Sequence, residues 1–222
     1  MLYAEIAARR AAPDLAERTD VLSQLIRVDD GGDRLTDPEL RDQLVTLLLA
    51  GHETTATALA WALHEIGRDS AQLARAREAA RAGDDGWLEA VLKEAMRLHP
   101  VIPMVVRTLL RPATIGGREV PAGATVAASI LLAHSRGESH RDPDAFRPER
   151  FVGHSPAPNT WIPFGGGVRR CIGASFSLME GVAVLREILS AYDVRAVGSD
   201  VPKVRNITSV PRRGARVVVT AR

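Results

Sequence analysis

The segment Phe164–Gly173 reads FGGGVRRCIG and contains the only cysteine of the 222-residue chain, Cys171. A lone cysteine forms no internal disulfide, so it is an inert core residue, a nucleophile or a metal ligand. We expect a helix to begin directly at Cys171, where backbone N–H groups and the nearby Arg169 would favour the thiolate over the thiol. Gly167 suits a turn that other residues avoid, and Gly173 suits the close approach of a flat macrocycle. The segment therefore indicates a thiolate that can ligate iron.

This segment resembles the haem-binding signature of the cytochrome P450 family, Phe-x-x-Gly-x-Arg-x-Cys-x-Gly. The matching residues are Phe164, Gly167, Arg169, Cys171 and Gly173. The resemblance implies that the chain binds haem b and that Cys171 is the axial thiolate ligand of the iron. It also implies that Phe164 shields the sulfur and that Arg169 pairs with a haem propionate. Electron donation from such a thiolate weakens the O–O bond of bound dioxygen.

Two other classes of protein also use a glycine-rich or cysteine-containing segment of this kind. The triple glycine suggests a dinucleotide-binding loop, but the glycine spacing of that motif fails at Arg170 and no strand–helix–strand unit surrounds it. A Cys–His nucleophilic enzyme needs a basic partner close to Cys171, and the sequence does not show which residues lie close to it.

A second motif, AGHETT at residues 50–55, lies in the middle of a long predicted helix. A glycine followed by two β-branched hydroxyl residues weakens a helix, so the motif calls for a reason. The Thr54 hydroxyl can bond back to the carbonyl of Ala50, which opens the helix locally for dioxygen and water. The motif resembles the oxygen-activation motif of the P450 family. The resemblance implies that Glu53 and Thr54 are the catalytic pair that relays protons, with Ala50 and Gly51 beside the haem.

Two alternatives apply to this motif as well. A zinc-protease interpretation of His52 and Glu53 needs a second histidine at position 56, where the chain has Ala56, so that interpretation is dropped. Ordinary core packing would also explain Gly51 and Thr54, and only the downstream cysteine segment favours the oxygen-activation role.

A third pattern joins Glu94 and Arg97, which are three residues apart on a predicted helix. This spacing normally gives an exposed ion pair worth about 0.2–0.5 kcal/mol. Apolar neighbours suggest that the pair is partly buried and needs further partners. Glu-x-x-Arg followed by Pro-x-Arg-Phe, here Pro148–Phe151, resembles a P450 pattern. The resemblance implies that Arg150 completes a structural charge cluster that locks the irregular segment presenting the cysteine.

The apolar run that follows, Val101–Val106, would line a substrate pocket and favours an apolar substrate. An ordinary buried strand remains the alternative for this run. Ten residues after Arg97, Arg107 lies where P450 proteins often bind the second haem propionate. The pocket candidates are Val101, Ile102, Met104 and Val105, with Thr208 and Ser209 in a C-terminal turn as weaker ones.

Hydrophobic periodicity predicts a mainly α fold with a small β-sheet, in the α+β class. We expect two helical pieces in residues 1–27, a long helix over 37–68 that starts with a Thr36–Glu39 capping box, and helices over 71–81, 87–99 and 171–192. Strands are expected within 101–129, with turns at 116–117 and 121–123, and a strand pair within 204–220 around a turn at 211–214. Residues 135–170 should be irregular and functional. The resemblance implies the C-terminal portion of the P450 fold as a single domain, 1–222.

The amino-acid composition limits the classes of protein to which the chain can belong. The chain is 45% hydrophobic and 25% charged, with aromatics at 4%, which is typical of a globular, Ala- and Leu-rich helical protein. Its 29 basic residues alternate with 27 acidic ones along predicted helices, so we expect a solvated surface and no nucleic-acid binding. No apolar stretch is long enough to span a bilayer, so we expect a soluble, cytoplasmic protein with no membrane contact.

The resemblance to the P450 family implies a haem-thiolate monooxygenase that inserts one oxygen atom from O2 into an apolar molecule, with electrons from a ferredoxin and its reductase or a similar donor. Arg169 and Arg170 could dock an acidic donor, although Arg170 could equally be a plain surface residue. The chain is about half as long as a family member, and we expect the N-terminal half and its substrate lid to be absent. The alternative is therefore a truncated, non-catalytic haem-binding or inert remnant, with the apolar face of the 37–68 helix uncovered. A peroxide-using or rearranging enzyme is disfavoured by Glu53 and Thr54.

Overall fold

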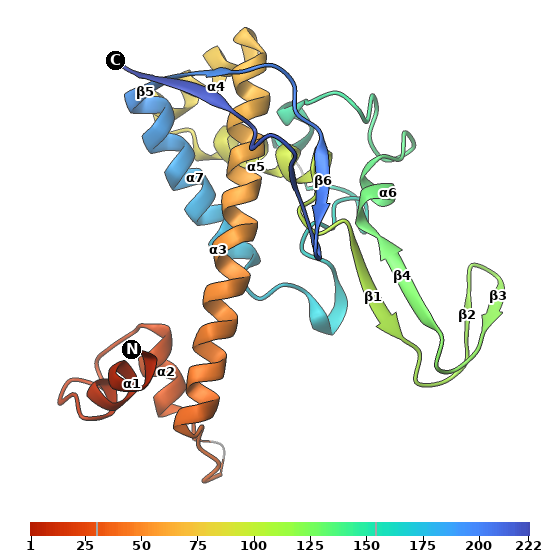
Figure 1. Cartoon of the computed structure of the whole chain (residues 1–222). Coiled ribbons are helices and arrows are strands. Elements are labelled where there is room, and N and C mark those ends of the chain that lie inside the picture. Colours follow the sequence, from red (N-terminus) through yellow and green to blue (C-terminus); the bar gives the residue numbers. More distant parts are fainter. Residues whose placement is uncertain (30, 154) are drawn as a thin grey trace. The chain divides into compact units, whose positions relative to one another are not determined.

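The computed structural model describes residues 1–29, 31–153 and 155–222. Its contacts divide the chain into two compact units, Met1–Glu53 and Thr54–Arg222, and the helix α3, Asp37–Arg68, passes from one into the other. Each unit is described by itself (Figure 1). The helix-rich architecture with small sheets confirms the predicted α+β class, and the single-domain expectation stays a prediction.

The first unit is a small helical cluster. It contains α1, Leu2–Arg10, and α2, Val21–Arg27, which confirm the two helical pieces expected in residues 1–27. Ile6, Leu22, Ile26 and Leu40 form its core. The predicted capping box starts α3: the Thr36 N–H donates to Glu39 Oε2 over 2.8 Å, and the Glu39 N–H donates back to Thr36 Oγ1 over 3.4 Å.

The second unit packs helices around one apolar core. Besides the second part of α3, its main helices are α4, Ser70–Ala82; α5, Asp85–Leu98; and α7, Ala174–Ala191. The α5–α7 contact is close, because a Cβ atom added at Gly181 would lie 2.3 Å from Leu92 Cδ2. Only glycine fits at that position without movement of the leucine. The core that results includes Trp61, Leu88 and Leu185, each 0% exposed.

The described part of the chain also contains four two-stranded antiparallel sheets. The strand β1, Met104–Thr108, pairs with β4, Thr125–Ser129, and β2, Ala113–Ile115, pairs with β3, Arg118–Val120, across the predicted Gly116–Gly117 turn. Figure 1 shows both pairs as one extended arm on the second unit. The remaining pairs are β5, Tyr192–Ala196, with β8, Val217–Ala221, and β6, Pro202–Arg205, with β7, Thr208–Pro211.

The C-terminal pairing differs from the prediction. Residues 211–214 do form a turn, with the Gly214 N–H 3.3 Å from the Pro211 carbonyl oxygen, but this turn carries the chain from one sheet to another. The hairpin turns instead at Asn206, whose φ of 55° lies in the left-handed region that asparagine tolerates. The strand β8 then pairs with β5, a strand that follows α7 directly and that the sequence pattern missed.

The irregular segment also differs in detail. A short helix, α6, Ile130–His134, precedes it, and one-turn 3₁₀ helices occur at η1, Pro148–Phe151, and η2, Gly167–Arg169. Ser129 caps α6 by accepting the Leu132 N–H over 3.1 Å. Five residues are too few for periodicity to reveal a helix, which explains why α6 was not expected. Within the described residues, no helix is both long and apolar enough to cross a membrane.

Candidate functional site

The cysteine segment folds into a tight loop closed by its own backbone. The Cys171 N–H donates to the carbonyl oxygen of Phe164 over 2.9 Å, and the Arg170 N–H donates to Gly167 over 3.1 Å. Gly165 and Gly167 adopt φ values of 67° and 66°, a region that disfavours residues with a Cβ atom. The glycines therefore make the reversal that brings the ends of the segment together.

The sequence placed Cys171 directly at the start of a helix, and this expectation is wrong. The helix α7 begins at Ala174, and Gly173 occupies its N-cap position without a side-chain cap. Ile172 and Gly173 form a turn between Cys171 and the first helical residue. Because the field of a helix acts mainly within its first turn, its support for a thiolate three residues upstream is weaker than expected.

The space around the cysteine is open. The Cys171 side chain is exposed, and so are Arg169 and Arg170. Cβ atoms added at Gly166 or Gly167 would meet nothing within 4 Å, and one at Gly173 would meet only the Cys171 sulfur, at 3.9 Å. At these three glycine positions, therefore, no side chain fills the space beside the loop.

Aromatic rings connect this loop to the helical core. The Phe164 ring meets the Trp161 ring edge-on at 5.8 Å between centroids, and Trp161 lies 5.7 Å from Phe151 of η1. The indole N–H of Trp161 donates to the backbone carbonyl of Lys93 in α5 over 3.1 Å. The residues that lead into the cysteine loop, 160–163, are called the strap below. Through Trp161 the strap is attached to both α5 and η1.

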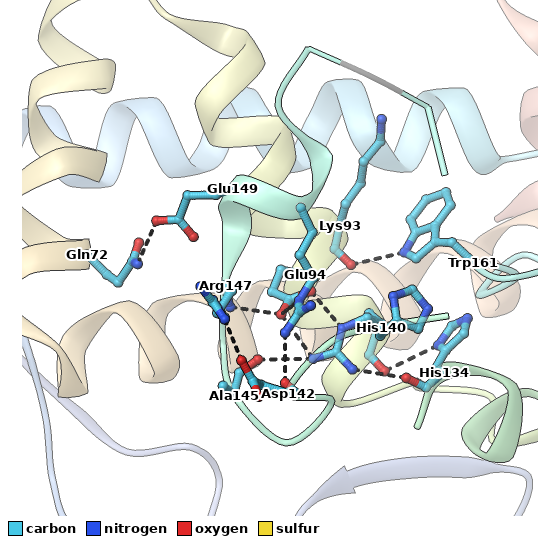
Figure 2. A network of polar contacts seen from close by, with 12 residues as sticks. Gln72, Lys93, Glu94, His134, His140, Asp142, Ala145, Arg147, Glu149 and Trp161 are labelled. Carbon is cyan, nitrogen blue, oxygen red and sulfur yellow. Dashed lines mark hydrogen bonds and ion pairs between the residues drawn. The ribbon is translucent and has the colours of Figure 1, made fainter. Parts of the chain in front are cut away.

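Glu94, Arg97 and Arg150 form one charge cluster through two ion pairs, and Figure 2 shows the polar contacts around Glu94. Arg97 donates to both carboxylate oxygens of Glu94, over 2.7 Å and 2.9 Å, and the Arg150 Nε donates over 3.1 Å. The backbone N–H of Arg147 adds a fourth bond, at 2.8 Å. Glu94 and Arg97 are 0% and 1% exposed, so this i,i+3 pair is fully desolvated.

The cluster also binds the irregular segment through backbone carbonyls. Arg97 donates to His134 over 3.0 Å and to Ala145 over 3.2 Å. Arg150 donates to the carbonyl of Asp142 over 2.7 Å. A buried ion pair adds stability only when its remaining hydrogen-bonding capacity is satisfied, and here the irregular segment satisfies it. The cluster therefore holds residues 134–150 against α5.

The apolar run and the β6–β7 hairpin meet in the structure, and Thr208 and Ser209 lie on the strand β7 rather than in the expected turn. The Ser209 N–H donates to the carbonyl of Val101 over 2.7 Å, and Val101, Thr208 and Ser209 are all buried. Val105 faces the cysteine loop, since a Cβ added at Gly165 would lie 3.9 Å from its Cγ1.

The other residues assigned to this region are more open. Ile102 is partly buried, and Met104 is 49% exposed. The exposed Arg107 donates to the backbone oxygen of its neighbour Val106, over 2.8 Å.

The AGHETT motif lies on α3 as expected, at the boundary between the two units. Ala50, Gly51 and Glu53 are exposed residues of the first unit, and Thr54 is a partly buried residue of the second. Thr55 is 6% exposed, and its hydroxyl donates to Ser177 Oγ of α7 over 3.1 Å. A hydroxyl pair therefore links α3 to the helix that follows the cysteine loop.

Sequence reasoning missed two buried histidines near the cluster, His134 and His140, which are 1% and 6% exposed. Both lie in or beside the segment for which no periodicity was found. A histidine within a proline-rich irregular segment is a weak signal, because such segments are normally on the surface. Only the fold shows that these imidazoles are enclosed.

The model of the family described as Cytochrome P450 matches residues 1–217. The chain belongs to the cytochrome P450 family. Proteins named cytochrome P450 135A1 and 135B1 from Mycobacterium tuberculosis are 54% and 47% identical to it over 98% and 100% of the chain. The chain spans about half the length of the curated relatives it matches, 49% in both of these cases.

Solved structures support the same P450 fold. A crystal structure of the cytochrome P450 CYP102L1 matches the whole chain with a TM-score of 0.88 at 29% identity, over 55% of its own length. A retinoic acid-bound cyanobacterial CYP120A1 matches 99% of the chain with a TM-score of 0.84, also at 29% identity and over 55% of its length. The P450 family and fold imply a haem iron, which gives the open cysteine loop its chemical context.

Proposed function

We propose that this chain forms the haem-thiolate region of a monooxygenase, with Cys171 as the axial ligand of haem b. The observation that carries the proposal is the loop at residues 164–173. Its only side chain able to ligate a soft metal is an exposed thiol, and its glycines place no side chain over the loop backbone at their positions. Such a loop suits a flat ligand that approaches the sulfur from solvent.

The donor set fits haem better than a bare metal ion. No group of three or more His, Cys, Asp or Glu side chains that could hold a metal occurs among the described residues. One thiolate is a poor site for an isolated ion, whereas a porphyrin brings its own equatorial ligands and needs only an axial one. Bound in this way, the haem would supply the activation of dioxygen that the polypeptide alone cannot perform.

The chain's own residues would then hold the ligand, shield it and move protons. The backbone bond from the Cys171 N–H to the Phe164 carbonyl oxygen holds Cys171 against the start of the loop, and by the family resemblance the Phe164 ring would shield the sulfur. The charge cluster of Glu94, Arg97 and Arg150 holds the strap from which the loop emerges. By the family resemblance, Glu53 and Thr54 deliver protons to the oxygen side, and Arg169 and Arg107 pair with the propionates.

The reaction we propose consumes O2, two electrons and two protons for each substrate molecule. One oxygen atom enters a C–H bond of the substrate and the other leaves as water. The electrons come from a separate donor such as a ferredoxin with its reductase, for which the exposed Arg169 and Arg170 offer a basic surface. Residues 101–106, Thr208 and Ser209 favour an apolar substrate. A lone cysteine suits a reducing compartment, so we propose a cytoplasmic location.

The test is the carbon monoxide difference spectrum of the reduced chain after haem reconstitution. We expect a strongly red-shifted Soret band that is lost in Cys171→Ala. In Cys171→His, haem should still bind but with a band typical of imidazole ligation. Val168→Ala, which changes an exposed residue of the same loop, is the matched control and should retain the red-shifted band. A spectrum that is unchanged in Cys171→Ala, or no haem uptake at all, contradicts the proposal.

A further inference from the structure

The strap that leads into the cysteine loop is anchored at three consecutive residues, 160–162. The Thr160 carbonyl is 2.8 Å from His140 Nε2, the Trp161 indole donates to the Lys93 carbonyl over 3.1 Å, and the Ile162 N–H donates to His134 Nε2 over 2.8 Å. Figure 2 shows both imidazoles beside Trp161. Two residues after the last anchor, Phe164 accepts the Cys171 N–H. These anchors therefore determine where the cysteine loop starts.

His134 can make its two contacts in only one protonation state. Its Nδ1 is 3.2 Å from the carbonyl oxygen of Arg97, an acceptor, so Nδ1 must carry a proton. Its Nε2 faces the N–H of Ile162, a donor, so Nε2 must be unprotonated. The ring is therefore the neutral Nδ1–H tautomer, and a second proton would set two N–H groups against each other.

His140 provides the contrast, because its bond to the strap survives protonation. Its Nε2 faces the Thr160 carbonyl and donates to it whether the ring is neutral or charged. Only the His134 contact is broken by acid. The same pH change therefore acts on the two imidazole anchors in different ways.

His134 also belongs to the charge cluster. The Arg97 guanidinium donates to the backbone carbonyl of His134, while the His134 ring donates to the backbone carbonyl of Arg97. This reciprocal pair joins α5 to α6 at the residue that also binds Glu94. The contacts run from Glu94 through Arg97 and His134 to Ile162.

We propose that His134 is a positioning residue which couples the charge cluster to the cysteine loop, and that it holds the loop only while its ring is neutral. The relevance of this coupling to an iron ligand rests on the proposed function, but the coupling itself does not. It would make the geometry of the cysteine loop depend on pH while the helical core keeps its structure.

The surroundings of His134 support a ring that stays neutral at ordinary pH. Burial lowers its pKa to about 4, and the positive charge of Arg97 from α5 and the nearby His140 act in the same direction. The His140 ring is 6.4 Å away between centroids and edge-on. Glu94, the nearest carboxylate of the cluster, has its oxygens occupied by Arg97, Arg150 and the Arg147 N–H.

Two amide substitutions each preserve one of the two contacts of the ring and remove the titratable group. In His134→Gln the side-chain oxygen can accept the Ile162 N–H, and nothing titrates. In His134→Asn the amide nitrogen can donate to Arg97, but no acceptor reaches Ile162. Amide hydrogen exchange of the whole chain would report both variants without any haem, with the N–H groups of Ile162, Gly165 and Cys171 as the loop set and those of Leu185 and Leu189 in α7 as the core reference.

We expect protection of the loop set to fall by about tenfold or more in His134→Asn, the effect of leaving a buried donor unsatisfied, while the core reference stays constant. His134→Gln should remain close to the unmodified chain at pH 7. Between pH 6 and pH 4 the unmodified chain and the matched control His140→Gln should lose loop protection relative to the core, whereas His134→Gln should not. Equal behaviour of Asn and Gln, a uniform loss across loop and core, or an acid response in His134→Gln overturns the proposal.

The carbon monoxide spectra of the same variants distinguish this inference from the proposed function. If exchange behaves as expected and no red-shifted band forms, the coupling stands and the haem-thiolate proposal fails. If the band forms and exchange shows no selective loop response, the haem-thiolate proposal stands and the coupling fails.

Discussion

The charge cluster and the cysteine loop lie on either side of one short strap, yet they are built in opposite ways. In the cluster, Glu94 and Arg97 are 0% and 1% exposed and bind only other parts of the chain. In the loop, the thiol of Cys171 is exposed, and its neighbours Val168 and Ile172 are 103% and 90% exposed. The cluster is thus satisfied by contacts within the chain, whereas the loop leaves its thiol and two apolar side chains exposed to solvent. The difference separates residues that maintain the fold from residues whose exposure agrees with the proposed ligand-binding role.

The largest effect should come from opening the cluster. We expect Glu94→Ala to lower the free energy of unfolding by about 3–5 kcal/mol, because Arg97 and Arg150 would keep buried positive charge without a counterion. Urea denaturation followed by circular dichroism measures this loss. The matched control is Glu78→Ala, which breaks an exposed pair at the same i,i+3 spacing, with Arg75, and should cost less than about 1 kcal/mol. Similar losses in both variants would remove the contrast between cluster and surface.

Acid should act on His134, which connects the charge cluster to the cysteine loop, and should lower the free energy of unfolding by somewhat less. The pKa of His134 is lowered by burial from 6.5 to about 4. As the pH falls below 6.5, His134 takes up a proton in the unfolded chain, whereas in the folded chain it stays neutral until about pH 4. The contribution of His134 to the free energy of unfolding is therefore complete above pH 6.5 and is lost towards pH 4. The loss amounts to about 3 kcal/mol at 1.4 kcal/mol per pH unit.

Carboxylates whose pKa is lowered by folding also begin to lose their stabilising contribution near pH 4, so the measurement is a difference between two proteins. Asp20, for example, has its pKa lowered to about 2 by the backbone N–H and the hydroxyl of Ser23. Unfolding free energies of the unmodified chain and of His134→Gln, compared at pH 7 and pH 4, cancel such shared contributions. We expect the unmodified chain to lose about 3 kcal/mol more than the variant. An equal loss of unfolding free energy in both proteins between pH 7 and pH 4 would show that protonation of His134 does not contribute.

The sequence predicted the two regions unequally, and the reason is physical. Glu94 and Arg97 lie one helical turn apart, so periodicity alone placed them on one face, and the apolar neighbours indicated burial. The bonds from Arg97 to His134 and Ala145 span 37 and 48 residues, and no local pattern encodes such separations. The fold was likewise predictable where helices are long and capped, as at Thr36. It was not predictable where pairing is non-local, as between β5 and β8.

For the cysteine loop, the sequence was more informative about residue types than about local geometry. Its residue types indicated the chemistry, because a lone thiol among glycines has few structural uses. Its position relative to α7 was misjudged by three residues, since Gly173 has no side chain that marks a helix start and Ala174 is simply the first residue with helical geometry. Residue identity thus supports a proposal for what the loop binds, whereas it did not predict where the helix after the loop begins.

The smallest effect on stability should come from the residue with the largest effect on the proposed chemistry. In the haem-free chain, we expect Cys171→Ser to change the free energy of unfolding by less than about 0.5 kcal/mol, because the side chain is exposed and the backbone bond from Cys171 to Phe164 is retained. After haem reconstitution, the parent should gain stability in proportion to the logarithm of haem concentration, and the serine variant should gain less. Urea denaturation of both proteins at several haem concentrations, zero included, measures the stability of the haem-free chain and the stability gained from haem separately. A large loss in the haem-free serine variant would mean that the thiol packs as part of the core, and the loop would then resemble the cluster rather than differ from it.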